Sequence, residues 1–134
     1  MRKINSICII DDDPITVFGI KKILNSIIVC DNIYTYINGK IAIDGIKEML
    51  IDGKDMPDVL FLDINMPIMD GWQFLEEFIH LDIDKKVRVN IVTSSIDPID
   101  KEKSELYKTR TGHTIVFINK PISREGIQKI TKAA

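Results

Sequence analysis

Short apolar runs alternate with amphipathic stretches five times along the chain. The runs are rich in isoleucine and valine, which is typical of strands covered on both faces of a sheet. They are Ile7–Ile10, Val29–Ile37, Val59–Leu62, Val89–Val92 and Ile115–Ile118. The second run is interrupted by Asp31 and Asn32. The pattern predicts five strands with helices between them.

Each stretch between the runs carries a signal for the start of a helix. Asp13 before Pro14 places a capping carboxylate ahead of a proline at the first helical position, and apolar residues then recur at helical spacing from Ile15 to Leu24. The other predicted helices begin at Asn38–Gly39, Asp70–Gly71, Asp97–Pro98 and Ser123. The second ends at Gly53, the fourth at about Lys108 and the fifth at about Lys132.

A strand–helix unit repeated five times predicts an α/β fold with one parallel sheet and right-handed crossovers, in a single domain over residues 1–134. Sheets of this kind bind ligands outside the carboxyl ends of their strands. Polar residues follow four of the predicted strands, as Asp11–Asp13, Asp63, Thr93–Ser95 and Asn119–Pro121. These residues should therefore converge at one edge of the sheet.

Three acidic groups that lie close together repel one another unless a cation compensates their charge. Carboxylate oxygens suit Mg²⁺, and Lys120 would add a fixed positive charge on the opposite side. A metal, an ammonium and a hydroxyl around one carboxylate suit phosphoryl transfer, and aspartyl-phosphates are a known class of intermediate. Taken singly, the acidic run is also a helix cap, and a Lys-Pro pair is common in loops. Their coincidence at four strand ends favours a site.

Composition limits the functions that are open to the chain. It has 134 residues, 45% of them hydrophobic and 28% charged, with a net charge of −2, which argues against direct binding to nucleic acid. No apolar run reaches the roughly 20 residues that would span a membrane, and no signal peptide is evident at the N-terminus. We therefore expect a cytoplasmic protein without a membrane partner.

The residues described above resemble a known family. Asp11–Asp12, the stretch Leu62–Gly71 around Asp63, Thr93 and Lys120–Pro121 match the receiver domain of response regulators in two-component signalling, over essentially the whole chain. The resemblance implies a flavodoxin-like, doubly wound (βα)5 fold with strand order 2-1-3-4-5. It also implies a stand-alone receiver, since no effector domain follows.

The resemblance further implies roles for particular residues. Asp63 would be the phosphoacceptor. Mg²⁺ would be held by Asp11, Asp12, Asp63 and the backbone carbonyl of Asn65.

A second group of residues would bind the phosphoryl group and respond to it. Lys120 and Thr93 would contact the phosphoryl oxygens, and Phe117 would be the aromatic switch that turns inward when Thr93 moves. The bond before Pro121 would be cis. Asn65 and Ser95 occupy positions that tune the rate of dephosphorylation in the family.

The phosphoryl donor would be a sensor histidine kinase or a histidine phosphotransfer protein. Phosphorylation would switch the surface formed by the fourth helix, fifth strand and last helix, which would contact an unknown downstream protein. The chain would be a monomer or would form a weak dimer through that surface. It would act as a signalling phosphoacceptor in a phosphorelay, catalysing only its own phosphorylation and dephosphorylation.

Three other functions use some of the same features. A phosphatase of the haloacid-dehalogenase type needs an acid two residues after its nucleophile, where this chain has Asn65. A degenerate receiver should lack an acid, the threonine or the lysine, and all are present. A flavodoxin-like cofactor carrier should have a Gly- and Ser/Thr-rich loop after the first strand, and none follows Ile10.

Overall fold

The computed structural model describes residues 2–133, which form one parallel five-stranded sheet in the order β2-β1-β3-β4-β5. The predicted α/β fold and strand order are confirmed. The strands are β1 (Arg2–Ile10), β2 (Ile28–Tyr36), β3 (Val59–Leu62), β4 (Arg88–Thr93) and β5 (Thr114–Asn119). The helices are α1 (Pro14–Ile27), α2 (Gly39–Ile51), α3 (Gly71–Phe78), α4 (Pro98–Arg110) and α5 (Arg124–Ala133).

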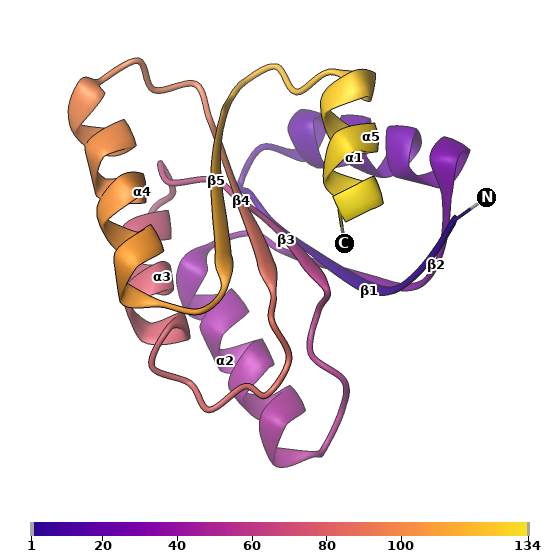
Figure 1. The fold of residues 1–134 in the computed structure, drawn as a ribbon, viewed down its shortest axis with the longest axis horizontal. Helices are drawn as coiled ribbons and strands as arrows, with labels where there is room; N and C mark the ends of the chain where they lie inside the picture. The colour runs from indigo at the N-terminus through magenta and orange to yellow at the C-terminus, as the bar shows by residue number, and fades with distance from the viewer. Residues whose placement is uncertain (1, 134) are drawn as a thin grey trace.

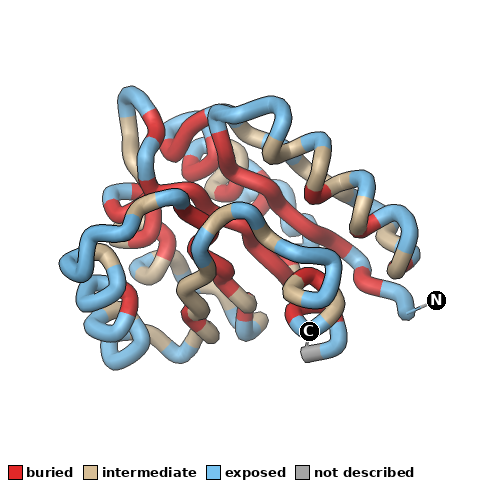
Figure 2. Tube along the Cα trace, turned by 90° about the horizontal axis from the view of Figure 1, so that it is seen from above, coloured by how far each residue is buried: buried red, intermediate tan, exposed pale blue. Residues whose placement is uncertain are grey.

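The helices cover both faces of the sheet, with α1 and α5 on one face and α2, α3 and α4 on the other (Figure 1). Each face has its own apolar cluster. Ile7, Ile9 and Phe61 belong to the cluster under α1 and α5, while Leu60 and Leu62 belong to the other. Because successive residues of a strand point to opposite faces, strands buried on both sides must be apolar throughout. Figure 2 shows the buried residues concentrated in the central strands.

The second strand is continuous, although Asp31 and Asn32 interrupt its apolar pattern. It lies at the edge of the sheet and pairs with β1 alone, so polar side chains within it can remain in solvent. The same pairing extends β1 to Arg2, five residues before the predicted start at Ile7. The length of β1 therefore follows from its partner strand rather than from its own apolar run.

The predicted helix starts are confirmed for all five helices, and in the last one the hydroxyl of Ser123 accepts from the N–H of Gly126 at 2.9 Å. Asp13, Asn38 and Asp97 each accept a hydrogen bond from a backbone N–H in the first turn of the following helix. Asp70 forms a capping box with Gln73, in which each side chain accepts from the other residue's backbone N–H. These caps begin α1 and α4 close to the ends of β1 and β4, whereas α3 begins only after the loop that starts with Asp63.

The helix α4 differs from the others because it is mostly polar and exposed. Among its residues the structure buries one, Ser104. It ends at Arg110, two residues beyond the predicted end. Across the described part of the chain, no helix combines the length and the apolar character needed to cross a membrane.

Candidate functional site

The acidic residues predicted to form a site lie together at the carboxyl edge of the sheet. Asp11 and Asp12 follow β1, and Asp63 follows the neighbouring strand β3, where its N–H donates to the carbonyl of Ile10 at 2.9 Å. One carboxylate oxygen from each of the three lies within 4.8 Å of the others. Asp11 and Asp63 are 4% and 6% exposed, whereas Asp12 is open to solvent. Two of the three charges are thus held away from bulk water.

Lys120 supplies the positive charge of this site. It follows β5, and its backbone N–H donates to the carbonyl of Thr93 at 2.8 Å. Its Nζ lies 3.0 Å from Oδ2 of Asp11 and 3.6 Å from Oδ2 of Asp63. The long side chain therefore reaches across the end of β4 to the two buried carboxylates.

The charges of the site are not balanced, because three carboxylates share one ammonium. Burial and the neighbouring charge of Asp11 raise the pKa of Asp63 above its ordinary value, and Lys120 only partly opposes them. Burial by itself lowers the pKa of Lys120. The hydrogen bond to Asp11 and the charges of both acids outweigh it, so that pKa lies above its ordinary value. Lys120 is therefore protonated, whereas ionising Asp63 costs more free energy in this site than it would in water.

Thr93 ends β4, the strand beside β3, and is fully buried. Its hydroxyl oxygen accepts a hydrogen bond from the N–H of Ser95 at 3.1 Å. The loop that contains Ser95 is also tied to β5, because the side-chain amide of Asn119 donates to the Ser95 carbonyl at 2.8 Å. The hydroxyl thus connects the sheet edge to the loop that leads into α4.

Phe117 occupies β5 opposite Ile91 of β4 and is half-buried against the apolar cluster that faces α2, α3 and α4. Tyr107 of α4 packs against the same cluster. The bond between Lys120 and Pro121 is cis, the isomer that the resemblance implied.

Asn65 begins the loop between β3 and α3, and its N–H donates to Oδ1 of Asp63 at 3.3 Å. The loop turns sharply at Ile68, which has a φ of 71°, and returns at Gly71. A side chain on Gly71 would place its Cβ 2.4 Å from the carbonyl oxygen of Asp63, so only glycine fits there. Sequence reasoning used Gly71 as a helix-start signal and missed this close approach.

Sequence reasoning also missed the link from the site to the outer helices. Oγ of Ser95 donates to Asp100 of α4 at 2.5 Å, and the indole N–H of Trp72 in α3 donates to the same carboxylate at 3.0 Å. Trp72 is stacked on Tyr107 of α4, with ring centroids 5.7 Å apart. No local pattern signals a contact between residues 28 positions apart, such as Trp72 and Asp100.

The donor set of the site is compatible with a divalent metal. The side chains of Asp11, Asp12 and Asp63 offer only oxygen atoms, which hard cations such as Mg²⁺ prefer. Burial is the main cause of the raised pKa of Asp63 and the charge of Asp11 the second, and a bound cation would oppose both by stabilising the ionised carboxylate. The residues present therefore fit a bound Mg²⁺.

Comparison with known proteins adds a second line of information. Residues 7–132 match the family model of the response regulator receiver domain. Over 85 residues the chain is 33% identical to the sensor histidine kinase CheAY of Helicobacter pylori. That alignment covers 63% of this chain and 10% of the longer protein, so the chain corresponds to a small part of that relative.

Solved structures with the same fold include a two-component response regulator from Cytophaga hutchinsonii. It is 27% identical with a TM-score of 0.83, and the match covers 98% of this chain and 97% of that one. Vibrio cholerae CheY4 is 19% identical with a TM-score of 0.72, over 97% and 98% of the two chains. The phosphorylated cyanobacterial phytochrome response regulator RcpA is 21% identical with a TM-score of 0.75, over 96% and 90%. At these identities the last two share the fold with this chain.

Proposed function

The chain belongs to the response regulator receiver domain family, and from that membership we propose that Asp63 accepts a phosphoryl group from a phosphohistidine on a partner protein. As a member of the family it is a receiver domain of a two-component system. The observation that carries the proposal is the position of Asp63 among Asp11, Asp12 and Lys120 at the carboxyl edge of the sheet. A buried carboxylate in that setting would be a nucleophile with one ammonium and two possible metal ligands beside it.

The proposed reaction exchanges one bond for another. A carboxylate oxygen of Asp63 forms a bond to phosphorus while the bond between phosphorus and the imidazole nitrogen breaks, and the electron pair of that bond stays on the nitrogen. Such a step depends mainly on alignment and on neutralising the charge spread over the phosphoryl oxygens. The ammonium of Lys120, already 3.6 Å from Asp63, would bind one of those oxygens.

Asp11, Asp12, Asp63 and the backbone carbonyl of Asn65 would hold Mg²⁺. When bound, the ion would supply the positive charge that Lys120 alone cannot, both to the carboxylates and to the phosphoryl oxygens. The burial of Asp11 at 4% exposure supports a role as a fixed ligand, and the exposure of Asp12 supports an open side from which the ion could enter.

The surroundings of the site support a protein as the phosphoryl donor. A hollow of about 450 Å³ adjoins the acidic residues and is lined by Asp11, Asp12, Phe18 and Ile37. Phe18 is 67% exposed and Ile37 65%. Apolar side chains that are exposed around a charged site suit contact with another protein, here a sensor histidine kinase or a histidine phosphotransfer protein. The similarity to part of a sensor histidine kinase agrees with such a pathway.

The switch would begin at Thr93. A phosphoryl group on Asp63 would attract the hydroxyl of Thr93, which now accepts from the N–H of Ser95. The loop would shift with Thr93, and Phe117 would turn into the space that it leaves. Ser95 is bound to Asp100, so the start of α4 would shift with the loop. A coupling of about 1–3 kcal/mol would suffice for such a switch.

The output of the switch would be the surface of α4, β5 and α5, which would bind a downstream protein. The chain itself would be a monomer or would form a weak dimer through this surface. The exposed and polar character of α4 supports this, because a helix with one buried residue can move at small cost. Residues 1–134 would act as one receiver unit in the cytoplasm. Turnover would be limited to its own phosphorylation and dephosphorylation.

Labelling with a small phosphoryl donor tests the proposal. Incubation with acetyl phosphate and Mg²⁺ should add one phosphoryl group, which peptide mass mapping should place on Asp63. The variant Asp63→Asn should not be labelled, whereas Asp84→Asn, which changes an acid at the other end of the sheet, should be labelled like the parent. Removal of Mg²⁺ with a chelator should also abolish labelling. Equal labelling of Asp63→Asn and the parent would refute the assignment.

A further inference from the structure

A second hollow lies between β2 and α2, and its lining includes none of the candidate residues Asp11, Asp12, Asp63, Thr93 and Lys120. Its volume is about 580 Å³. It is lined by Tyr34 and Tyr36 on the strand side and by Ile41, Asp44, Glu48 and Asp52 on the helix side. We call it the α2–β2 groove.

One wall of the α2–β2 groove is a row of carboxylates. Asp44 and Glu48 of α2 and Asp52, which caps its C-terminal end, are spaced four residues apart, so they lie on one side of the helix at intervals of about 6 Å along its axis. Asp44 forms an exposed ion pair with Lys40 at 3.1 Å. Within residues 2–133, Glu48 and Asp52 have no ion pair. The groove is therefore acidic, because three carboxylates and one lysine, Lys54, line it.

The other wall is aromatic. Tyr36 lies directly against Gly45 of α2, where an added Cβ would come within 2.6 Å of the phenol oxygen. The glycine thus allows the ring to sit against the helix. Both Tyr34 and Tyr36 are half-buried, and they line the same hollow as the carboxylates. Carboxylates next to aromatic rings form a favourable environment for the cations of lysine and arginine.

A smaller hollow of about 380 Å³ continues the groove and shares Tyr34 and Lys54 with it. It is lined also by Asn5, Ser6, Asp31, Asn32 and Asp55. Ser6 is 3% exposed, and its hydroxyl is buried without a hydrogen-bond partner. Buried hydroxyl groups normally have a partner, so this one points to a polar group supplied from outside the described chain.

The strand next to the groove is also open on one side. β2 is the edge strand of the sheet (Figure 1) and pairs with β1 alone, so its opposite side has no neighbouring strand within the described chain. An extended segment added there would project every second side chain toward the groove, at intervals of about 6.6 Å. This interval is close to the spacing of the carboxylates on α2.

We propose that the α2–β2 groove binds an extended, basic segment of a partner protein, with lysine or arginine at alternate positions. The segment would pair its backbone with β2, and its cations would lie between the tyrosine rings and the carboxylates of α2. The negative charge of the groove disfavours nucleic acid and anionic lipid. This surface is separate from Asp63, so a basic partner could bind whether or not Asp63 is phosphorylated.

The probe for this proposal is a peptide of about eight residues in which lysine and threonine alternate. It is titrated into isotope-labelled protein in excess Mg²⁺, and the amide signals are followed by NMR. Signals of β2 and α2 should shift. The double variant Glu48→Lys, Asp52→Lys should bind the peptide at least about tenfold more weakly, a loss of about 1.4 kcal/mol.

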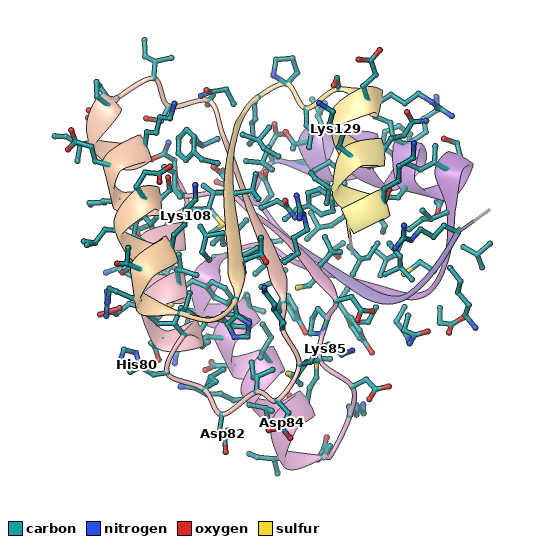
Figure 3. All side chains as sticks on the ribbon, viewed as in Figure 1. His80, Asp82, Asp84, Lys85, Lys108 and Lys129 are labelled. Atoms are coloured by element: carbon teal, nitrogen blue, oxygen red, sulfur yellow. The ribbon has the colours of Figure 1, made fainter. Side chains whose placement is uncertain are left out.

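A matched control carries the same change of charge elsewhere. Asp82 and Asp84 lie in the loop between α3 and β4, at the lower edge of the molecule in Figure 3. The double variant Asp82→Lys, Asp84→Lys should bind the peptide like the parent. No shift at millimolar peptide, shifts centred on Asp63, or equal weakening in both double variants would overturn the proposal. Labelling of Asp63 should be unchanged in the groove variant, so failure of labelling would bear on the phosphoacceptor alone.

Discussion

The two ends of the sheet handle charge in opposite ways. At the amino end, Lys85 lies 3.0 Å from Oδ1 of Asp58, whose other oxygen accepts from the N–H of Ser6 at 3.2 Å. At the carboxyl end, the carboxylates of Asp11, Asp12 and Asp63 share the single ammonium of Lys120. The carboxylate of Asp58 at the amino end has an ammonium of its own, whereas three carboxylates at the carboxyl end share one.

The amino end also keeps a histidine neutral. His113 accepts a hydrogen bond from the N–H of Val87 at 2.9 Å and lies against the ring of Phe78, and burial lowers the pKa of this histidine. The difference between the ends teaches that stability and chemistry are separated in space. The amino end stabilises the fold, and the carboxyl end gives up stability to hold carboxylates in excess of positive charge.

Removing the ammonium at the carboxyl end should have the largest effect. Lys120→Met would leave two buried carboxylates without a cation, which should lower the free energy of unfolding by about 3 kcal/mol at pH 7. Labelling of this variant by acetyl phosphate should also fall, because the ammonium that would bind a phosphoryl oxygen is gone. Urea unfolding and phosphoryl incorporation measure the two effects.

Lys129→Met is the matched control, because Lys129 is an exposed lysine of α5 that forms no ion pair within residues 2–133 (Figure 3). It should change the free energy of unfolding by less than about 0.5 kcal/mol. Its phosphoryl incorporation should match that of the parent. Equal losses in the two variants would mean that the cation at the sheet edge has no special role.

Breaking the ion pair at the amino end should have an intermediate effect on stability and none on chemistry. Asp58→Ala removes the acceptor for the N–H of Ser6 and the partner of Lys85, which should lower the free energy of unfolding by about 1–2 kcal/mol. Labelling of Asp63 should stay within about twofold of the parent, a difference below 0.5 kcal/mol. A large loss of labelling in a variant that remains folded would contradict the separation of the two ends.

The smallest effect is expected at Ile68, in the loop beside Asp63. Its φ of 71° is strained for a β-branched residue, and its side chain is 82% exposed. Ile68→Asn should therefore raise the free energy of unfolding by about 1 kcal/mol. Ile51→Asn replaces an equally exposed isoleucine at the end of α2 and should give no gain. A gain in both variants would point to surface polarity rather than to backbone strain.

The carboxyl end could be predicted from the sequence because its residues follow apolar runs directly. Once the strands are parallel, Asp11, Asp63, Thr93 and Lys120 must come to the same edge. The caps at Asp13 and Asp70 could also be predicted, because each bonds to a backbone N–H only two or three residues further along the chain. Strand ends and helix starts are encoded by neighbouring residues.

The rest depends on contacts between residues that are distant in the chain. Ser6 and Asp58 meet because β1 and β3 are neighbours, and Trp72 reaches Asp100 because α3 packs beside α4. The early start of β1 follows from pairing with β2. The spacing of residues along the chain does not predict these contacts, because they depend on which strands pair and which helices pack together in the fold.

The most direct test of the excess charge at the carboxyl end is the unfolding of Asp63→Asn as a function of pH, without divalent cations. The pKa of Asp63 is raised in the folded state, so that state binds more protons than the unfolded one, and the stability contributed by protonated Asp63 is lost as pH rises through the folded pKa. The neutral variant avoids this loss. We expect it to be more stable than the parent by about 1 kcal/mol at pH 7 and the gain to shrink as pH falls toward the ordinary range of aspartate. A variant less stable than the parent at pH 7, or a difference that does not change with pH, would contradict the excess of negative charge around Asp63.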